Sequence, residues 1–408
     1  MPLSLLSCVP SNARRRPPSA LWAALLLASG LNAARGIAVE PLPDPGPGPT
    51  ITAPESAAPP EAMYIPDPQG ADGFAGLAPF MPPEDLPTWP RWFAGANGLV
   101  MTRTLPAGTA TMQPVGGVQL STGAAGASWP GGVDLHIGRW FGPRQHNAVE
   151  LIYWGVYGIG SSASVTASGI NAVPQAGGAS VGGTPANNYL LGASSQQITR
   201  SDLVNDIEIN WVYSLWDRPE FLSRDPAKPG RSVNLMWLAG FRFFQLNDTL
   251  ALATSSATAG SPLDFDVATN NNLYGGQVGA KFDWHLLSRL RFSAVPKFLI
   301  AGNAITNTST LSTGGGTFAT FNGSGAPVSV YSNMGVFSWL GSVDTGLAWD
   351  VTDHWSLSLG YRVVGVGNIA QADGQWPANI TTAADLSGIT AGSSTIIHGG
   401  FAGFEGRY

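Results

Sequence analysis

The sequence predicts an all-β protein, an antiparallel transmembrane β-barrel of about ten strands, and three observations lead to it. Period-2 alternation recurs between Arg91 and Tyr408, and no apolar run there reaches the roughly 18 residues of a membrane helix. The gaps between alternating segments are short and long in turn, as in outer-membrane barrels. Aromatic residues lie on the apolar faces beside the short gaps, where a membrane interface would hold them.

The composition excludes several other classes of protein. Charged residues make up 11% of the 408 residues, against about 25% in soluble domains. The net charge of -6 excludes a nucleic-acid-binding protein, which would need a basic face. A single cysteine, Cys8, excludes a disulfide scaffold and a cysteine-built metal site.

Residues 1–38 are predicted to be a secretory signal peptide. The cationic cluster Arg14–Arg16 precedes the apolar run Ala20–Ser29, and small residues follow. This is the order of a secretory signal, with cleavage expected near Ala34 or Ala38. The protein is therefore expected to be exported to the outer membrane, and Cys8 to leave with the signal.

Residues 39–90 are predicted to be an acidic, proline-rich, disordered linker. They hold 15 prolines and eight acidic residues but no Lys or Arg. Proline at this density blocks helices and central strands alike. A docking arm for another envelope component is the alternative to a passive spacer.

Residues 91–408 are predicted to form the barrel. In the fourth alternating segment, Ile207, Ile209 and Trp211 face one way while Asp206 and Glu208 face the other. The ten expected strands are 92–103, 131–141, 147–158, 202–215, 232–245, 272–284, 289–301, 336–350, 354–365 and 395–408. Residues 160–198 and 304–335 could each hide a further hairpin, which would give twelve strands.

The connections give the barrel a direction. The short gaps are 142–146, 217–231, 285–288 and 351–353, and the other five gaps are long and rich in small polar residues. Outer-membrane barrels have short periplasmic turns and long surface loops. An even strand number therefore places both ends of the barrel chain on the periplasmic side.

Alternation also assigns side chains to the two faces. An aromatic girdle against outer-membrane lipid is expected from Trp284, Phe292, Trp349, Trp355 and Tyr408. The charged residues expected to face the lumen are Asp134, His136, Glu150, Asp206, Glu208, Arg242, Lys281, Asp283, Arg291, Lys297, Asp344, Arg362, Glu405 and Arg407.

The charges in the lumen are unevenly distributed along the chain. Strands two to four carry acids, and strands five to seven and nine carry bases. One hypothesis is that opposed acidic and basic walls create a transverse field, with a modest anion preference if the barrel conducts. The alternative is a network of ion pairs that fills a narrow lumen.

No catalytic or cofactor site is predicted. His136 beside Asp134 could be a base and its orienting group, but no nucleophile can be placed with them. Phosphate-loop, dinucleotide and metalloprotease motifs are absent from the sequence. The protein is therefore expected to have no enzymatic activity, no cofactor and no bound metal.

Three short stretches carry a resemblance to a known family. They are Trp92–Leu99, Gly240–Asp248 and Asn272–Gly279. With them, most of residues 91–408 resembles a planctomycete outer-membrane family of β-barrel porins. The resemblance implies a pore and no catalytic residues. Tyr408 is similar to the terminal aromatic by which the barrel assembly machinery recognises the last strand of outer-membrane proteins.

Three functions follow as hypotheses. The first is a porin-like passive channel for small solutes. The second is a non-conducting barrel with a structural, surface-display or adhesive role. The third, a barrel-embedded surface enzyme, is the least favoured. The sequence reveals neither a solute nor an oligomeric state.

Overall fold

The computed structural model describes residues 90–218, 232–256 and 260–408. The predicted signal peptide, and the linker up to residue 89, lie outside these residues. No helix among the described residues is long and apolar enough to cross a membrane.

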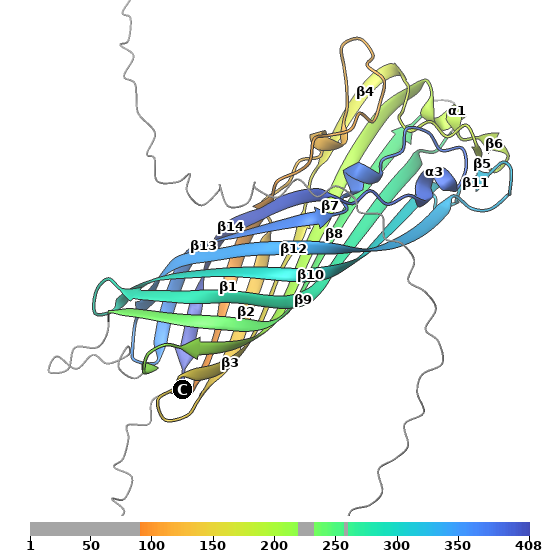
Figure 1. Ribbon diagram of the computed structural model, residues 1–408. Coiled ribbons are helices and arrows are strands. Elements are labelled where there is room, and N and C mark those ends of the chain that lie inside the picture. The colour runs from red at the N-terminus through yellow and green to blue at the C-terminus, as the bar shows by residue number, and fades with distance from the viewer. Residues whose placement is uncertain (1–89, 219–231, 257–259) are drawn as a thin grey trace, which may run out of the picture. The chain divides into compact units, whose positions relative to one another are not determined.

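Ten antiparallel strands form a closed barrel in the described part of the chain (Figure 1). Neighbouring strands are consecutive, the first pairs with the last through Phe93 and Arg407, and β3 pairs with β7 to complete the ring. The strands are β1 (Trp92–Arg103), β2 (Gly131–Phe141), β3 (Asn147–Ile159), β7 (Ala193–Ser214), β8 (Val233–Ser255), β9 (Leu263–His285), β10 (Leu290–Thr313), β12 (Ser329–Asp350), β13 (Trp355–Ile369) and β14 (Ser393–Arg407). Closure leaves no unpaired edge, which a sheet in hydrocarbon requires.

The predicted fold class is confirmed, and each predicted segment corresponds to one barrel strand. The ends beside the short turns agree within a few residues, whereas the long strands extend further at the opposite end than predicted. β7 begins at Ala193 rather than at 202, and β10 ends at Thr313 rather than at 301.

The suggestion of twelve barrel strands is wrong. Residues 160–198 and 304–335 lengthen β7, β10 and β12 instead of adding a pair of strands to the ring. They also form the short elements β4 (Ser162–Ile170), β5 (Ala179–Val181), β6 (Thr184–Pro185), α1 (Asn187–Leu190) and β11 (Thr320–Phe321).

The outer face of the long strands changes character halfway along. On β9, Phe282, Val278 and Tyr274 face outward near the short turns, and Asn270 and Asp266 face outward beyond them. β9 has 23 residues, whereas a strand needs about 9–11 to cross a bilayer. The lower half of the strand therefore fits the lipid, and the upper half stands outside it.

The long connections and the upper strand ends fold together into a cap (Figure 1). It contains β4, β5, β6, α1, β11, η1 (Thr122–Ala124), η2 (Ala372–Gln375) and α3 (Ala384–Ser387). Its apolar core includes Leu250, Phe265, Phe321 and Trp376. The Phe265 and Trp376 rings pack edge to face with centroids 5.1 Å apart, so the surface loops form a folded unit.

Both ends of the barrel chain lie at the opposite end, beside the short turns. The backbone N–H of Arg91 donates to the carbonyl oxygen of Tyr408 at 2.7 Å. The described turns there are residues 142–146, 286–289 and 351–354, and Gly142 has φ of 78°, a conformation that favours glycine.

Candidate functional site: the barrel lumen

The inner face of β8 passes through every layer of the lumen. From the short-turn end upward, its inward residues are Asn234, Met236, Leu238, Gly240, Arg242, Phe244, Leu246, Asp248, Leu250, Leu252 and Thr254. Charged and apolar positions alternate in blocks along this face. The same order on the neighbouring strands divides the lumen below the cap core into four layers. From the short turns upward, they are the vestibule, the ion-pair layer, the apolar septum and the upper ion cluster.

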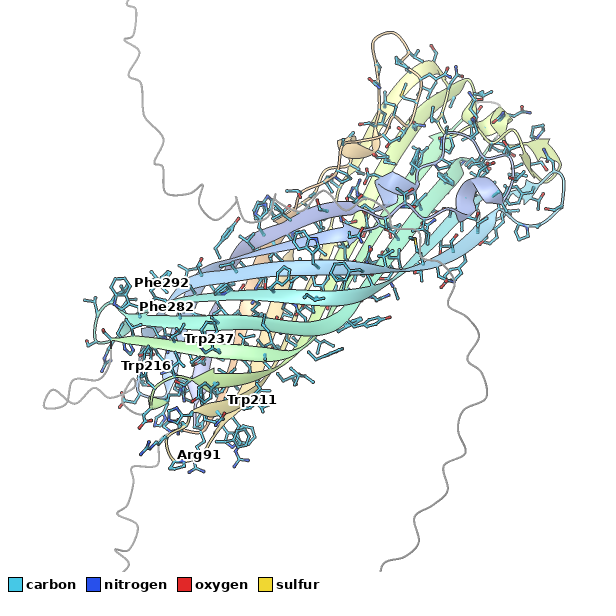
Figure 2. All side chains as sticks on the ribbon, in the orientation of Figure 1. Arg91, Trp211, Trp216, Trp237, Phe282 and Phe292 are labelled. Carbon is cyan, nitrogen blue, oxygen red and sulfur yellow. The ribbon has the colours of Figure 1, made fainter. Side chains whose placement is uncertain are left out.

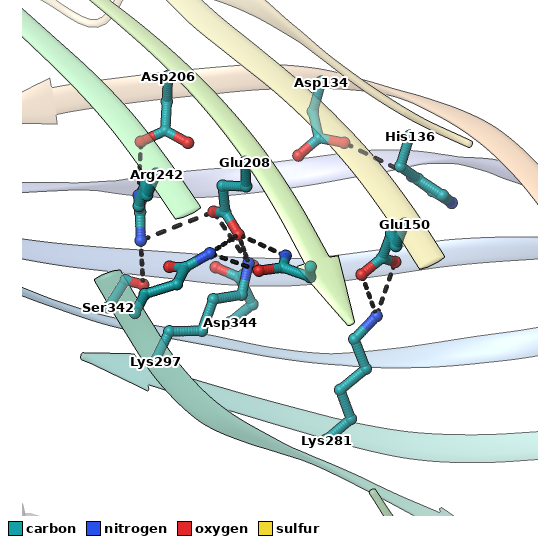
Figure 3. A network of polar contacts seen from close by, with 12 residues as sticks. Asp134, His136, Glu150, Asp206, Glu208, Arg242, Lys281, Lys297, Ser342 and Asp344 are labelled. Carbon is teal, nitrogen blue, oxygen red and sulfur yellow. Dashed lines mark hydrogen bonds and ion pairs between the residues drawn. The ribbon is translucent and has the colours of Figure 1, made fainter. Parts of the chain in front are cut away.

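The ion-pair layer lies at the level of Arg242 (Figure 3). Arg242 Nε donates to Asp206 at 2.7 Å, and Lys297 Nζ lies 2.8 Å from Glu208. Gln277 Nε2 also donates to Glu208, at 2.9 Å. All five side chains are almost fully buried, so each charge depends on its partner.

A second group of ion pairs includes two that connect strands that are not neighbours in the sheet. Arg362 on β13 lies 2.7 Å from Asp134 on β2 and 2.8 Å from Asp344 on β12. Lys281 on β9 lies 2.6 Å from Glu150 on β3. These side chains meet across the lumen, so the lumen is narrow at this height.

The acidic and basic walls contact each other in the structure. Acids lie on β2, β3 and β7, and bases on β8, β9, β10 and β13. The two sets meet because a ring of ten strands leaves little more room than its own side chains occupy. The alternative, a network of ion pairs, describes the structure.

The apolar septum is the layer directly above. It is a contiguous cluster of buried apolar side chains from nine of the ten barrel strands. Trp154 on β3 and Phe244 on β8 are 1% and 0% exposed, with ring centroids 6.2 Å apart. Its other members are Leu99, Met101, Val156, Ile159, Val204, Leu246, Leu273, Leu299, Ala301, Leu340, Val364, Val366, Ile369 and Ile397. The septum closes the lumen at this level.

The upper ion cluster lies between the septum and the cap. Arg103 lies 2.8 Å from Asp202 and 2.9 Å from Asp248. Arg200 lies 2.9 Å from Asp248 and 2.7 Å from Asp373 of η2, which attaches the connection between β13 and β14 to the barrel wall. This cluster was not identified from the sequence. Extending the alternation of β8 past residue 245 would have placed Asp248 on the same face as Arg242.

The vestibule is a cavity of ≈ 220 Å³ between the ion-pair layer and the short turns. Its lining includes His136, Arg218, Asp283, Arg291 and Glu405. The ring of His136 lies between two carboxylates, with Nδ1 3.7 Å from Asp134 and Nε2 3.6 Å from Glu405.

Arg407 also lies at the vestibule. It binds Glu405 at 2.9 Å and lies 3.4 Å from Asp350.

Arg218 was not identified from the sequence, because it follows β7 in a connection without alternation. Every charged residue that alternation assigned to the lumen lies on the inner face.

The residues of the proposed girdle lie on the outer face near the short turns, as Figure 2 shows for Phe292. Trp284, Trp349, Trp355 and Tyr408 are 43–61% exposed, and Phe292 is partly exposed. Trp211 and Trp237, which were not among the predicted girdle residues, are 61% and 53% exposed at the same end. An outward belt of this kind suits the interface between headgroups and acyl chains.

Metal-ion chemistry has no evident site within the described ranges, where no three His, Cys, Asp or Glu side chains gather closely enough to hold an ion. The lack of a cofactor stays a prediction. What the lumen offers chemically is a set of ion pairs, a closed apolar layer and a charged cavity.

The match to a family of barrel proteins agrees with the architecture. A family model described as "Putative beta barrel porin-7 (BBP7)" matches residues 96–395. Among solved structures, the outer-membrane protease OmpT of Escherichia coli is 10% identical, with a TM-score of 0.41, and the match covers 79% of this chain and 98% of that one. The translocator domain of the autotransporter NalP from Neisseria meningitidis is 9% identical, with a TM-score of 0.32, over 78% and 88% of the two chains. No curated protein sequence matches the chain.

Proposed function

The chain belongs to the family described as "Putative beta barrel porin-7 (BBP7)", and from that premise we propose that it is an outer-membrane barrel, closed to solutes at rest, that displays its folded cap at the cell surface. This is the non-conducting alternative among the functions that the sequence allows. A passive channel for small solutes is the second candidate.

The observation that carries the proposal is the apolar septum. Water-filled porin lumens are polar, whereas this layer packs Trp154, Phe244 and their neighbours with almost no exposed surface. Exposing one such large side chain to water costs about 1.5–3 kcal/mol. A path for ions through this layer would expose several of them at once.

The cap supports a role at the surface. The upper halves of β7–β12 rise beyond the apolar outer band and carry loops that share the apolar core around Phe265 and Trp376. Such a core gives the loops a defined shape, which is what a surface that binds or packs against other envelope components requires. A barrel that only conducts has no need of it.

The second candidate is supported by the family description and by the vestibule. A cavity that reaches the ion-pair layer from the short-turn side would be the inner half of a pore if the septum could open. Single-channel recording in planar bilayers separates the two candidates. We expect the purified full-length protein to be silent, and regular conductance steps from it would favour the passive channel.

A variant of the septum tests whether the septum is what prevents conduction in the parent protein. Phe244→Ala should create a cavity in the septum, and with Leu246→Ala it should give measurable leak currents. Phe241→Ala, on the lipid side of the same strand, is the matched control and should stay silent. Because a core Phe→Ala change costs about 3–5 kcal/mol, each variant is first checked for the folded, heat-modifiable band on gels.

Further parts of the assignment are proposals as well. We propose no enzymatic activity, since both ring nitrogens of His136 face carboxylates rather than a nucleophile. We propose that the barrel assembly machinery recognises the last strand through Tyr408, whose side chain is 61% exposed. Cleavage near Ala34 or Ala38 and the planctomycete link stay predictions.

A further inference from the structure

The vestibule contains a buried arginine without a carboxylate partner. Arg218 is 8% exposed, and no described carboxylate oxygen lies within the 4.0 Å of an ion pair. Its guanidinium stacks on Trp140 with the central carbon 4.4 Å from the ring centroid, and Nη1 donates to Gln145 at 3.4 Å. Stacking fixes the plane of the guanidinium and leaves most of its five donors available.

Arg291 is the second cation there with weak compensation. Its side chain is 12% exposed, and its closest carboxylate contact is Nε to Asp283 at 3.9 Å. That buried Nε has no hydrogen-bond partner among the described residues. By contrast, Lys281, Lys297 and Arg362 each hold a carboxylate oxygen within 2.6–2.8 Å.

The neighbouring arginines affect the pKa of Arg218. Burial, together with the nearby Arg407 and Arg291 guanidiniums, lowers the pKa of Arg218 to about 9, which still leaves it charged at neutral pH. Carboxylates of the vestibule, including Glu405, already bind other partners. The lining contains equal numbers of carboxylates and of Lys and Arg side chains, but these acids bind the other cations closely and leave Arg218 and Arg291 weakly compensated.

We propose that the vestibule binds a small oxyanion, a carboxylate or phosphate, between Arg218 and Arg291. Guanidinium groups recognise both anions through paired N–H donors. The ≈ 220 Å³ cavity is many times the roughly 10–15 Å³ that admits one water molecule, so it has room for a small dicarboxylate or inorganic phosphate. The proposal does not depend on whether the barrel conducts.

The oxyanion has two sources, a free solute or a carboxylate of this same chain. The Pro90 carbonyl accepts a hydrogen bond from Gln145 Nε2 at 3.3 Å, and Gln145 also contacts Arg218. Glu84 and Asp85 are therefore only a few residues from the site along the chain. The segment 39–90 carries eight acidic residues and no basic one, and a tether makes their effective concentration high.

Isothermal titration calorimetry of the full-length protein in neutral detergent, with succinate and with inorganic phosphate, tests binding. Arg218→Gln and Arg291→Gln should each weaken it about tenfold or more, because a hydrogen bond to a charged group is worth that much. Arg218→Lys keeps the positive charge but loses the paired N–H donors of the guanidinium. Its affinity for the anion should therefore lie between that of the parent and that of Arg218→Gln. Arg144→Gln, at the same end with a 75% exposed side chain, is the control and should bind as the parent does.

The source is tested with a variant that removes the nearest acids of the segment, Glu84→Gln with Asp85→Asn. Equal binding by parent and variant identifies a free solute as the ligand. Tighter succinate binding by the variant identifies the chain's own carboxylates as competitors. The proposal is overturned if neither protein binds either anion, or if Arg144→Gln weakens binding as much as Arg218→Gln does.

Discussion

At the scale of single residues, burial decides what each charge in the lumen does. Lys297 and Lys281 both pair with glutamates, but the side chain of Lys297 is 4% exposed and that of Lys281 is 19% exposed. Water can replace a lost partner only where it can enter. The two lysines therefore form a matched pair for measuring the importance of the network.

We expect Lys297→Gln to lower the free energy of unfolding by about 3 kcal/mol, since removing one partner of a buried pair leaves the other charge, Glu208, uncompensated. Lys281→Gln should cost less, because Glu150 lines the vestibule, where water can replace the lysine, whereas Glu208 does not. Urea unfolding of the barrel in detergent, followed by tryptophan fluorescence, measures both. Equal losses would mean that water reaches both lysines alike.

The sequence could predict which face these residues occupy, but not their partners. Successive side chains of a strand point to opposite faces, so alternation is enough to place Asp206, Glu208 and Arg242 inside. Which acid meets which base depends on the stagger and curvature of the closed ring. The pair Arg362–Asp134 joins residues 228 positions apart, and no local pattern contains that information.

At the scale of elements, the outer face of β9 lies in two environments, lipid near the short turns and water beyond them. Val278 and Ala268 both point outward from β9, and Val278 is 62% exposed within the apolar band. Ala268 lies between the polar residues Asn270 and Asp266. The upper ends were missed for this reason, since outside the lipid the outer face becomes polar while the inner face carries apolar residues of the cap core such as Leu250 and Phe265. The apolar face of the strand therefore changes side, and the pattern of the lower half does not continue.

Val278→Arg should therefore destabilise the barrel by about 2–4 kcal/mol in lipid vesicles, the cost of an arginine near the bilayer midplane. Ala268→Arg should cost close to nothing, because its side chain stands in water. Refolding titrations in vesicles measure both. A larger loss for Ala268→Arg would place the membrane higher on the strands than the outer face indicates.

One buried ion pair is the charged contact that attaches the connection between β13 and β14 to the barrel wall. Arg200 reaches Asp373 of η2 at 2.7 Å, and Arg200 is 2% exposed. Asp373→Asn should increase hydrogen exchange over residues 370–392, because the loop loses its charged anchor while Arg200 keeps Asp248. Asp385→Asn is the control.

Asp385 is exposed in the same loop and accepts hydrogen bonds from the backbone N–H groups of Thr381 and Thr382, which lower its pKa. Its replacement should change exchange only around α3. If both variants release the whole loop equally, the Arg200–Asp373 pair is not what attaches it.

At the scale of the whole molecule, the direction of the barrel in the membrane follows from its asymmetry. The chain ends and short turns lie at one end and the cap at the other. This arrangement could be predicted from loop lengths alone, because the lengths of short and long connections are visible in the sequence. The septum could not be, since residues such as Leu246 and Ile369 lie outside the predicted strands and meet only after closure.

Cysteine labelling tests this direction, and the chain is well suited to it because its one cysteine, Cys8, lies in the predicted signal peptide. Gly315→Cys adds a side chain at the tip of the cap, where a Cβ would meet only Thr313 at an ordinary 3.8 Å. An impermeant maleimide should label it on intact cells. Ser288→Cys, in the exposed turn after β9, should react only once the outer membrane is opened. Labelling of Ser288→Cys alone on intact cells would invert the barrel, and any labelling of the mature parent protein would show that residue 8 is retained.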